Sequence, residues 1–380
     1  MRSAKPGERP FAPRTYGRLE RVTPRVYLFR NVVNSVVVLG DDAAAVIDTQ
    51  VNAPMARRLL AHVKELTGKP LRWAINTHYH WDHTAGNGIF REAGATLVSS
   101  ALTREFMQTR AARQQAFLAS RGFEPGPEPC PAGETVTDER EIDLGNQRLV
   151  LKSLGAAETD DALAVHLPQE GCTAAGDTVM TGSFPMFGQP VMDEGLMGTP
   201  RWLDTLGAIE RLGADHVLPG HGPVAREAEL ALLKRLERYF LDEVGARVAR
   251  GMPLPALLAD LEPRLPDWIT SIPVVWGTPR YAILRVYRGL ARAEGDEVGW
   301  QQYKPSAIPC ADGPRVSAAC EGLADAASFQ AAAQEFAEGG DPGSAIAAAR
   351  HATECLPDEP AAWVCLADHL VRGAAHTASV

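Results

Sequence analysis

Residues 77–83 of this chain read Thr77-His78-Tyr79-His80-Trp81-Asp82-His83. Three imidazoles and one carboxylate fall within six residues, in the spacing His-x-His-x-Asp-His. Imidazole and carboxylate groups are common protein ligands of zinc and other first-row transition metals. So many ligand side chains in so short a stretch predict a metal site rather than a solvated polar loop.

The flanking residues place this motif after a buried strand. Residues 71–77 contain aromatic and β-branched side chains that predict such a strand, and Gly86 and Gly88 open the helix that follows. In a loop at the end of a strand, alternate side chains can point the same way. We therefore expect His78 and His80 to bind one ion, and Asp82 and His83 to turn towards a second.

The motif resembles the signature of the metallo-β-lactamase superfamily, and three further stretches occur in the family's order over residues 18–250. They are Val46-Ile-Asp48-Thr, whose aspartate would support the histidines; Ala175-Gly-Asp177, whose aspartate would bridge both ions; and Leu218-Pro-Gly-His221-Gly-Pro, with the last metal histidine. The resemblance implies an αβ/βα sandwich of two packed sheets with outer helices. The alternation of predicted strands and helices favours the same α/β architecture.

One position departs from the family's commonest pattern. Where most relatives carry Gly-x-x-His-Thr, residues 155–159 read Gly-Ala-Ala-Glu-Thr. The resemblance thus implies that Glu158 replaces a histidine ligand of the first ion; the alternative is a surface residue beside a degraded site. The implied ligand set is His78, His80 and Glu158 for one ion, Asp82, His83 and His221 for the other, and Asp177 between them.

This ligand set has a consequence for charge. The three carboxylates and a bridging hydroxide would together neutralise two divalent ions, so the centre should acidify its bound water less than an all-histidine version. Carboxylate oxygen suits iron and manganese better than imidazole does, but the Irving–Williams order favours zinc. We expect two divalent ions, most simply zinc, with iron or manganese as the alternative.

Composition excludes several classes of function. The chain has 380 residues, a net charge of −9 and a pI near 5.6, without the basic surface that nucleic acid requires. It contains neither an unbroken apolar run long enough for a membrane helix nor a leader-type apolar region in its first residues. Six cysteines without a Cys-x-x-Cys pair indicate reduced thiols and a cytoplasmic location.

The chain divides into an N-terminal arm (1–17), a catalytic domain (18–250), a helical connector or dimerisation segment (251–310) and an α-helical tail (311–380). The tail resembles the helical dimerisation region of alkyl sulfatases, a branch of the same superfamily, and so implies a homodimer. The alternative is a tetratricopeptide-like hairpin that binds nothing in particular. Its predicted helices are residues 329–337, 345–355 and 359–370.

Within the catalytic domain, residues 180–200 form a long connection beside Asp177 that we interpret as an active-site wall or as an ordinary cover loop. Its apolar members are Phe184, Met186, Phe187 and Met197. The other expected elements are strands at 25–30, 35–39, 43–48, 162–167 and 172–175, a hairpin at 141–151, and helices at 54–67, 103–121 and 227–248.

Two histidines and two arginines have open roles. His166 and His216 are interpreted as core or rim residues outside the metal shell. Arg201 or Arg280 would pair with an anionic substrate group or, alternatively, lie on the surface.

These features favour a dinuclear metal-dependent hydrolase that cleaves an ester-type bond of a small molecule. A hydroxide shared by the ions would attack a sulfate ester, a carboxylic ester or a lactone. Asp82 would orient that nucleophile, and Asp48 would fix the tautomer of a ligand histidine. Alkyl sulfatases carry glutamate at the position of Asp177, which leaves the three ester classes equally open.

Two other functions are considered. The combination of Glu158 with Asp177 also resembles a di-iron, O₂-dependent oxygenase of this fold that acts in secondary metabolism, because carboxylate-rich shells stabilise ferric iron. The last alternative is a metal-bound scaffold that acts through its tail.

Overall fold

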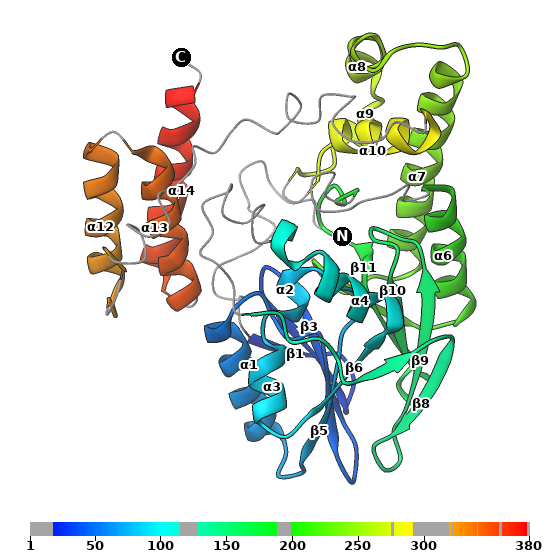
Figure 1. Ribbon diagram of the computed structural model, residues 1–380, viewed down its shortest axis with the longest axis vertical. Coiled ribbons are helices and arrows are strands. Elements are labelled where there is room, and N and C mark those ends of the chain that lie inside the picture. The colour runs from blue at the N-terminus through cyan, green and yellow to red at the C-terminus, as the bar shows by residue number, and fades with distance from the viewer. Residues whose placement is uncertain are drawn as a thin grey trace.

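The computed structural model (Figure 1) describes most of the chain. The predicted N-terminal arm lies outside the described residues, as do residues 292–310 of the predicted connector. The described ranges are 18–114, 128–187, 199–274, 277–291, 319–320, 323–339, 341–356 and 359–377.

Two β-sheets form the centre of the molecule. The first follows chain order: β1 (Arg18–Arg21), β2 (Val26–Arg30), β3 (Ser35–Leu39), β4 (Ala44–Ile47), β5 (Leu71–Ile75), β6 (Thr96–Ser100) and β7 (Glu134–Val136). Neighbouring strands from β1 to β4 pair antiparallel, and neighbouring strands from β4 to β7 pair parallel.

The second sheet has the order β12 (His216–His221), β11 (Cys172–Met180), β10 (Ala162–Leu167), β9 (Arg148–Gly155) and β8 (Glu139–Asp143). Only β11 and β12 run parallel within it. The predicted hairpin is confirmed, since Gly145 and Asn146 adopt the left-handed conformation of its turn.

Alternation along the strands explains why the sheets stack. In β3, Val36 and Val38 face the second sheet, whereas Val37 faces the helices on the outer side. The residues between the sheets come from both of them, and Leu151 and Val165 are fully buried there. Each sheet therefore buries two faces, and helices must cover the outer ones.

Helices supply that cover on both sides (Figure 1). On the first sheet, α1 (Ala53–Leu66) packs its apolar stripe beside α3 (Asn87–Glu92), and the Asn52 side chain caps α1 by accepting from the Met55 amide at 2.9 Å. On the second sheet lie α6 (Thr199–Arg211) and α7 (Glu227–Val248). The structure is the αβ/βα sandwich that the sequence predicts.

The remaining elements of this region are short. Helix α2 (Trp81–Thr84) follows β5, and α4 (Ala101–Thr109) follows β6. The helix predicted at 103–121 is therefore interrupted at Arg110, the C-cap of α4, and residues 115–121 lie outside the described residues. After α7 come α8 (Leu254–Leu261), a 3₁₀ turn at Glu262–Arg264, α9 (Asp267–Thr270) and α10 (Pro279–Ala291). Another 3₁₀ turn, at Pro168–Glu170, joins β10 to β11. Helices α8 to α10 share one apolar cluster with α6 and α7.

Three helices end the chain, close to the predicted stretches: α12 (Ala326–Glu338), α13 (Pro342–Cys355) and α14 (Pro360–Thr377). Asp325 and Asp341 cap the first two by accepting from the Ser328 and Ser344 amides. Their shared core is mostly alanine, which lets the helices approach closely. Figure 1 shows them beside α1, away from α6 and α7. The tetratricopeptide-like character and the dimer remain predictions.

Two expectations from composition can be compared with the described residues. Cys130, Cys172, Cys320, Cys355 and Cys365 are all free thiols, as predicted. In the part of the chain that is described, we find no helix with the length and apolarity needed to cross a bilayer.

Glu237 places a carboxyl group inside the core under α7. The side chain is fully buried, and neither oxygen has a hydrogen-bond partner among the described residues. Burial raises the pKa of Glu237 well above its ordinary value, and the charge of Arg285 offsets this only in part. Because the folded-state pKa is raised, the carboxyl group favours folding below its unfolded-state pKa and loses that contribution as the pH rises through the folded-state value.

We predict that Glu237→Gln increases the free energy of unfolding at pH 8 by about 1–3 kcal/mol, the cost typical of an uncompensated buried polar group. At pH 4 the carboxyl group is largely protonated whether the chain is folded or not, so the gain should nearly vanish. Thermal denaturation at both pH values measures the difference. Asp242→Asn, on the exposed side of the same helix, is the control. An equal gain at both pH values would contradict the prediction.

Candidate metal centre

The side chains that the sequence predicts as ligands converge at one edge of the sandwich, and all of them are buried. They come from the loop after β5, from α2, from the turn after β9, and from the strands β11 and β12. In that order they are His78 and His80; Asp82 and His83; Glu158; Asp177; and His221.

The ligand atoms form two groups, and within each group they lie within 4.8 Å of one another. The first donor group is His78, His80, Glu158 and Asp177; the second donor group is Asp82, His83 and His221. The division matches the predicted one, in which His78 and His80 face one ion and Asp82 and His83 face another.

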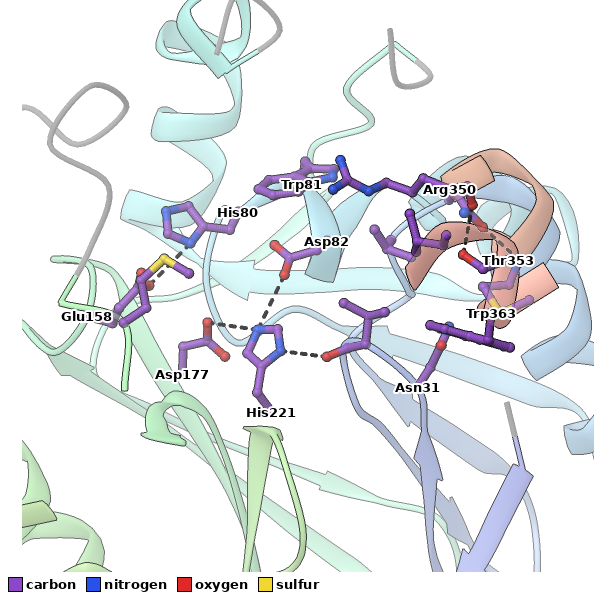
Figure 2. A pocket seen from close by; sticks show the side chains of 16 residues that line it. Asn31, His80, Trp81, Asp82, Glu158, Asp177, His221, Arg350, Thr353 and Trp363 are labelled. Carbon is purple, nitrogen blue, oxygen red and sulfur yellow. Dashed lines mark hydrogen bonds and ion pairs between the residues drawn. The ribbon is translucent and has the colours of Figure 1, made fainter. Parts of the chain in front are cut away.

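Asp177 lies between the two donor groups. Its Oδ2 is 3.8 Å from His78 Nε2 in the first group and 3.3 Å from His221 Nε2 in the second, and its Oδ1 is 3.3 Å from His83 Nε2. Figure 2 shows Asp177 and Asp82 both directed at the same nitrogen of the His221 ring, Nε2. One carboxylate therefore reaches both groups, as the predicted bridging role requires.

Glu158 lies where the sequence predicts an unusual ligand. Its Oε2 is 3.2 Å from His80 Nδ1 and 3.8 Å from His78 Nε2, and the side chain is 1% exposed. Arg285, on α10, donates to the Glu158 backbone carbonyl at 3.0 Å and so holds the turn. The alternative of a surface residue is wrong, because the turn after β9 points Glu158 into the centre.

Asp48 supports the centre from outside. It accepts hydrogen bonds from the Thr77 amide and hydroxyl and from His83 Nδ1, each at 2.8 Å. With its Nδ1 proton held by Asp48, His83 presents Nε2 to the two donor groups, which is the tautomer a metal ligand needs. Asp48 has a left-handed backbone conformation, with φ 60°. This arrangement agrees with the supporting role predicted for it.

His221 and His78 are oriented in the same manner. His221 Nδ1 lies 2.7 Å from the Val32 carbonyl oxygen, and His78 Nδ1 lies 3.1 Å from the Thr77 hydroxyl. In both rings the nitrogen that faces the centre is Nε2. Partners on the outer nitrogens fix the direction of each ring before any ligand arrives.

Several polar atoms at the centre have no hydrogen-bond partner. Among the described residues, none bonds to His78 Nε2, His83 Nε2 or Asp177 Oδ1, although all three atoms are buried. Buried polar atoms nearly always have a partner. Because these three face one small space, and because imidazole and carboxylate are the donors of zinc, iron and manganese, the residues fit a bound divalent metal.

Electrostatics at the centre favour added positive charge. Burial alone would lower the pKa of His221, but Asp177 and Asp82 outweigh it and raise the pKa to about 10. In the same way, Asp177 and Asp48 overcome burial and raise the pKa of His83. Burial would raise the pKa of Asp82, yet the cationic rings lower it to about 2. The carboxylates thus stay ionised and attract a cation.

Two glycines allow the strands to approach the centre. A Cβ atom on Gly220 would lie 1.9 Å from Asp177 Oδ1, so any side chain there would displace this carboxylate. Gly176 has a left-handed φ of 51°, and a Cβ there would meet the Thr77 hydroxyl at 2.3 Å. The glycines beside Asp177 and His221 in the sequence are therefore steric requirements.

The structure corrects the expected end of one strand. The sequence analysis ends the strand near residue 175, with Asp177 at its edge, but β11 continues to Met180. Its register with β12 shifts on both sides of Gly176. The irregular pairing turns Asp177 towards the centre without ending the strand, which periodicity alone does not reveal.

A cavity of about 350 Å³ opens above the donor groups. Its floor includes His80, Asp82, Glu158, Asp177 and His221. Residues beside β2 and α1 also line it: Asn31, Val32, Val51, Asn52 and Met55. The rest of the lining comes from Trp81 and Met186 and from the C-terminal helices, with Arg350, Thr353, Trp363 and Leu366; Figure 2 shows Asn31 next to Trp363.

The predicted active-site wall is only partly correct. Met186 lines the cavity, whereas Phe184 and Phe187 pack into the core beneath α7, with ring centroids 6.0 and 5.8 Å from that of Phe240. Both phenylalanines are fully buried, because the apolar face of α7 requires a partner. Met197 lies outside the described residues.

The open roles of the other histidines and arginines are now decided. His166 bonds to the Thr173 hydroxyl at 3.0 Å, and neither His166 nor His216 belongs to a donor group, as predicted. Arg280 pairs with Glu262 and Arg201 is exposed, so neither lines the cavity. The arginine that lines the cavity is Arg350. The sequence analysis missed it, because α13 carries no motif and reaches the cavity only through its packing against α1.

The order and geometry of these residues agree with one known family. A family model of the metallo-β-lactamase superfamily matches residues 28–221, just over half of the chain. The chain belongs to the metallo-β-lactamase superfamily. This membership places it among metal-dependent hydrolases.

Relatives within the superfamily are distant. The chain is 23% identical over 209 residues to a type 2 metallo-β-lactamase of Bacteroides fragilis. The matched residues cover 55% of this chain and 76% of the Bacteroides fragilis protein. It is 21% identical over 311 residues to a linear primary-alkylsulfatase of a Pseudomonas species, covering 69% of this chain and 56% of the relative.

Among solved structures, the sec-alkylsulfatase Pisa1 of Pseudomonas sp. has a TM-score of 0.57 at 16% identity, covering 92% of this chain and 61% of Pisa1. That likeness extends the shared fold beyond the sandwich into the C-terminal helices. The chain spans about three fifths of the length of these two alkylsulfatases.

We predict that Asp48→Asn weakens metal binding by about tenfold to a hundredfold, the usual effect of losing a partner of a ligand histidine. Asparagine tolerates the left-handed backbone at this position and can still accept from the Thr77 amide. It cannot hold the His83 proton as a carboxylate does. Competition with a fluorescent chelator measures the affinity.

The control for this substitution is Asp138→Asn, an exposed aspartate on the turn before β8. Its metal affinity should equal that of the unmodified protein. If Asp48→Asn binds metal as tightly as Asp138→Asn does, Asp48 does not orient His83 for a ligand role.

Proposed function

We propose that this member of the metallo-β-lactamase superfamily is a dinuclear hydrolase that cleaves an ester-type bond of a small molecule. The observation that carries the proposal is the pair of donor groups on the floor of one cavity, with Asp177 within 3.8 Å of histidines in both groups. Cavities of about 300–1,000 Å³ suit small ligands rather than polymers.

Each donor group would hold one ion. His78, His80 and Glu158 would bind the first, Asp82, His83 and His221 would bind the second, and Asp177 would bridge them. Divalent ions held there would supply Lewis-acid polarisation of the substrate and a more acidic water. Mixed imidazole and carboxylate donors accommodate zinc, which we propose as the natural metal, with iron or manganese as outcomes of the test.

Asp82 is proposed as the catalytic residue of the chain itself. It lines the cavity, and its Oδ2 lies 3.4 Å from His221 Nε2 and 3.7 Å from His83 Nε2. The pKa of about 2 keeps Asp82 ionised at neutral pH. An ionised carboxylate at the edge of the cavity can orient an attacking water by accepting a hydrogen bond from it.

Three ester classes fit this site: sulfate esters, carboxylic esters and lactones. Two relatives are named alkylsulfatases, which supports a sulfate ester. The cavity supports any ester with an apolar body, because most of its side walls are apolar. The relatives described above are hydrolases and lend no support to the di-iron oxygenase alternative. A homodimer through the C-terminal helices and a cytoplasmic location remain predictions.

The test combines metal analysis with turnover under nitrogen. Protein purified without added metal should contain about two divalent ions per chain. It should then release nitrophenol from nitrophenyl esters or nitrophenyl sulfate without oxygen. Two irons together with turnover that requires oxygen would overturn the hydrolase.

We predict that Glu158→Ala lowers the metal content from about two ions per chain to about one. The substitution keeps the Glu158 backbone carbonyl, to which Arg285 donates at 3.0 Å, so this contact still holds the backbone of the turn. Glu158→His, which restores an imidazole donor, should keep both ions. Plasma mass spectrometry of dialysed protein gives the stoichiometry, with the exposed Glu92→Ala as the control. Two ions in Glu158→Ala would remove this residue from the ligand set.

A further inference from the structure

The C-terminal helices form a wall of the cavity over the metal centre. Arg350 and Thr353 come from α13, and Trp363 and Leu366 come from α14. In Figure 2, Arg350, Thr353 and Trp363 lie across the cavity from Glu158 and Asp177. A segment more than a hundred residues beyond the last predicted ligand therefore reaches the space where a substrate must bind.

This wall is fixed by packing. Helix α13 contacts α1, whose first turn contributes Met55 to the lining of the same cavity. Ala345, Ala348 and Ala352 of α13 are buried against the neighbouring helices. Small side chains on the buried face bring the helices close together and direct the longer side chains of α13 and α14 outwards.

Arg350 gives the cavity a positive charge opposite its floor. Among the residues that line the described cavity it is the one arginine or lysine, and Figure 2 shows its side chain extending towards Trp81. The lining carboxylates, Asp82, Glu158 and Asp177, all belong to the donor groups, where bound ions would balance their charge. An anion that enters the cavity is therefore attracted at Arg350.

A second donor belongs to the same cavity. The Asn52 side chain uses its oxygen to cap α1, and its Nδ2 is buried without a hydrogen-bond partner among the described residues. An amide N–H group and a guanidinium are both donors for carboxylate, sulfonate or phosphate oxygens. Trp81, Trp363 and Leu366 supply apolar surface in the same space.

We propose that Arg350 binds an anionic group of the substrate that is separate from the ester bond to be cleaved, with the Asn52 amide as a further donor in the same cavity, while Trp81 and Trp363 contact the apolar body of the substrate. The inference rests on the proposed function for the position of the reacting ester, which must lie on the donor groups. Arg350 comes from the opposite wall, so the group that it binds is a different part of the molecule. The substrate is accordingly an ester that carries a second, negatively charged group.

Matched substrates test the proposal by kinetics. Mono(4-nitrophenyl) adipate carries a free carboxylate, and 4-nitrophenyl methyl adipate is its neutral counterpart. The unmodified enzyme should favour the anionic ester in kcat/KM by about ten- to a hundredfold, the range for hydrogen bonds to charged groups. Arg350→Gln should lose that preference through a higher KM for the anionic ester, and kcat/KM for the neutral ester should change less than about threefold.

Two variants control for charge and for folding. Arg350→Lys keeps the charge without the planar pair of donors and should retain part of the preference. Arg238→Gln removes an exposed arginine from α7 and should behave as the unmodified enzyme does. Metal content of about two ions per chain in every variant shows that the centre is intact. A preference that persists in Arg350→Gln, or that is absent from the unmodified enzyme, would overturn the proposal.

A binding measurement separates this proposal from the hydrolase itself. Calorimetric titration compares hexane-1-sulfonate, a poor metal ligand, with neutral hexyl methyl sulfone. The metal-loaded protein should bind the sulfonate at least about tenfold more tightly, and Arg350→Gln should bind both alike. Suppose that the unmodified protein binds the sulfonate selectively, that Arg350→Gln loses this selectivity, and that the unmodified protein cleaves no ester or sulfate. That result would support the anion site and refute the hydrolase. Ester cleavage by a protein that shows no selectivity for the sulfonate would support the hydrolase and refute the anion site.

Discussion

Burial of three carboxylates beside four imidazoles is the constraint on which the rest of the structure depends. Ionised groups removed from water destabilise a fold by several kcal/mol unless opposite charge and hydrogen bonds surround them. Asp177 meets this requirement by lying against histidines from both donor groups. Among the described residues, the same arrangement leaves buried nitrogen and oxygen atoms without hydrogen-bond partners, and a divalent cation would complete it.

The sandwich explains how such distant residues meet. Strands β5, β11 and β12 bring their carboxyl ends to one edge, and the outer helices keep both sheets rigid beneath it. Asp48 and the Val32 carbonyl then orient His83 and His221 from behind. Arg285 extends this support to the turn of Glu158, so the segment beyond α7 also contributes to the centre.

The chain separates two tasks between two parts of its length. The sandwich supplies the floor, where the donor groups and Asp82 lie, and the C-terminal helices supply a wall with Arg350 and Trp363. Because the wall contains no proposed ligand, its residues can change the choice of substrate without altering the metal centre. The alanine-rich core packs α13 against α12 and α14, and α13 in turn contacts α1.

Local properties of the sequence indicated the alternation of strands and helices and the ligand-type residues at 78–83. The resemblance to the superfamily added the sandwich and the residues Glu158, Asp177 and His221. Even Glu158 was found from its place in a short motif. Only the tertiary structure decided that Phe184 and Phe187 lie in the core, that β11 continues past Asp177, and that Arg350 reaches the cavity. Each of these depends on contacts between segments far apart in the chain, which periodicity within one segment does not encode.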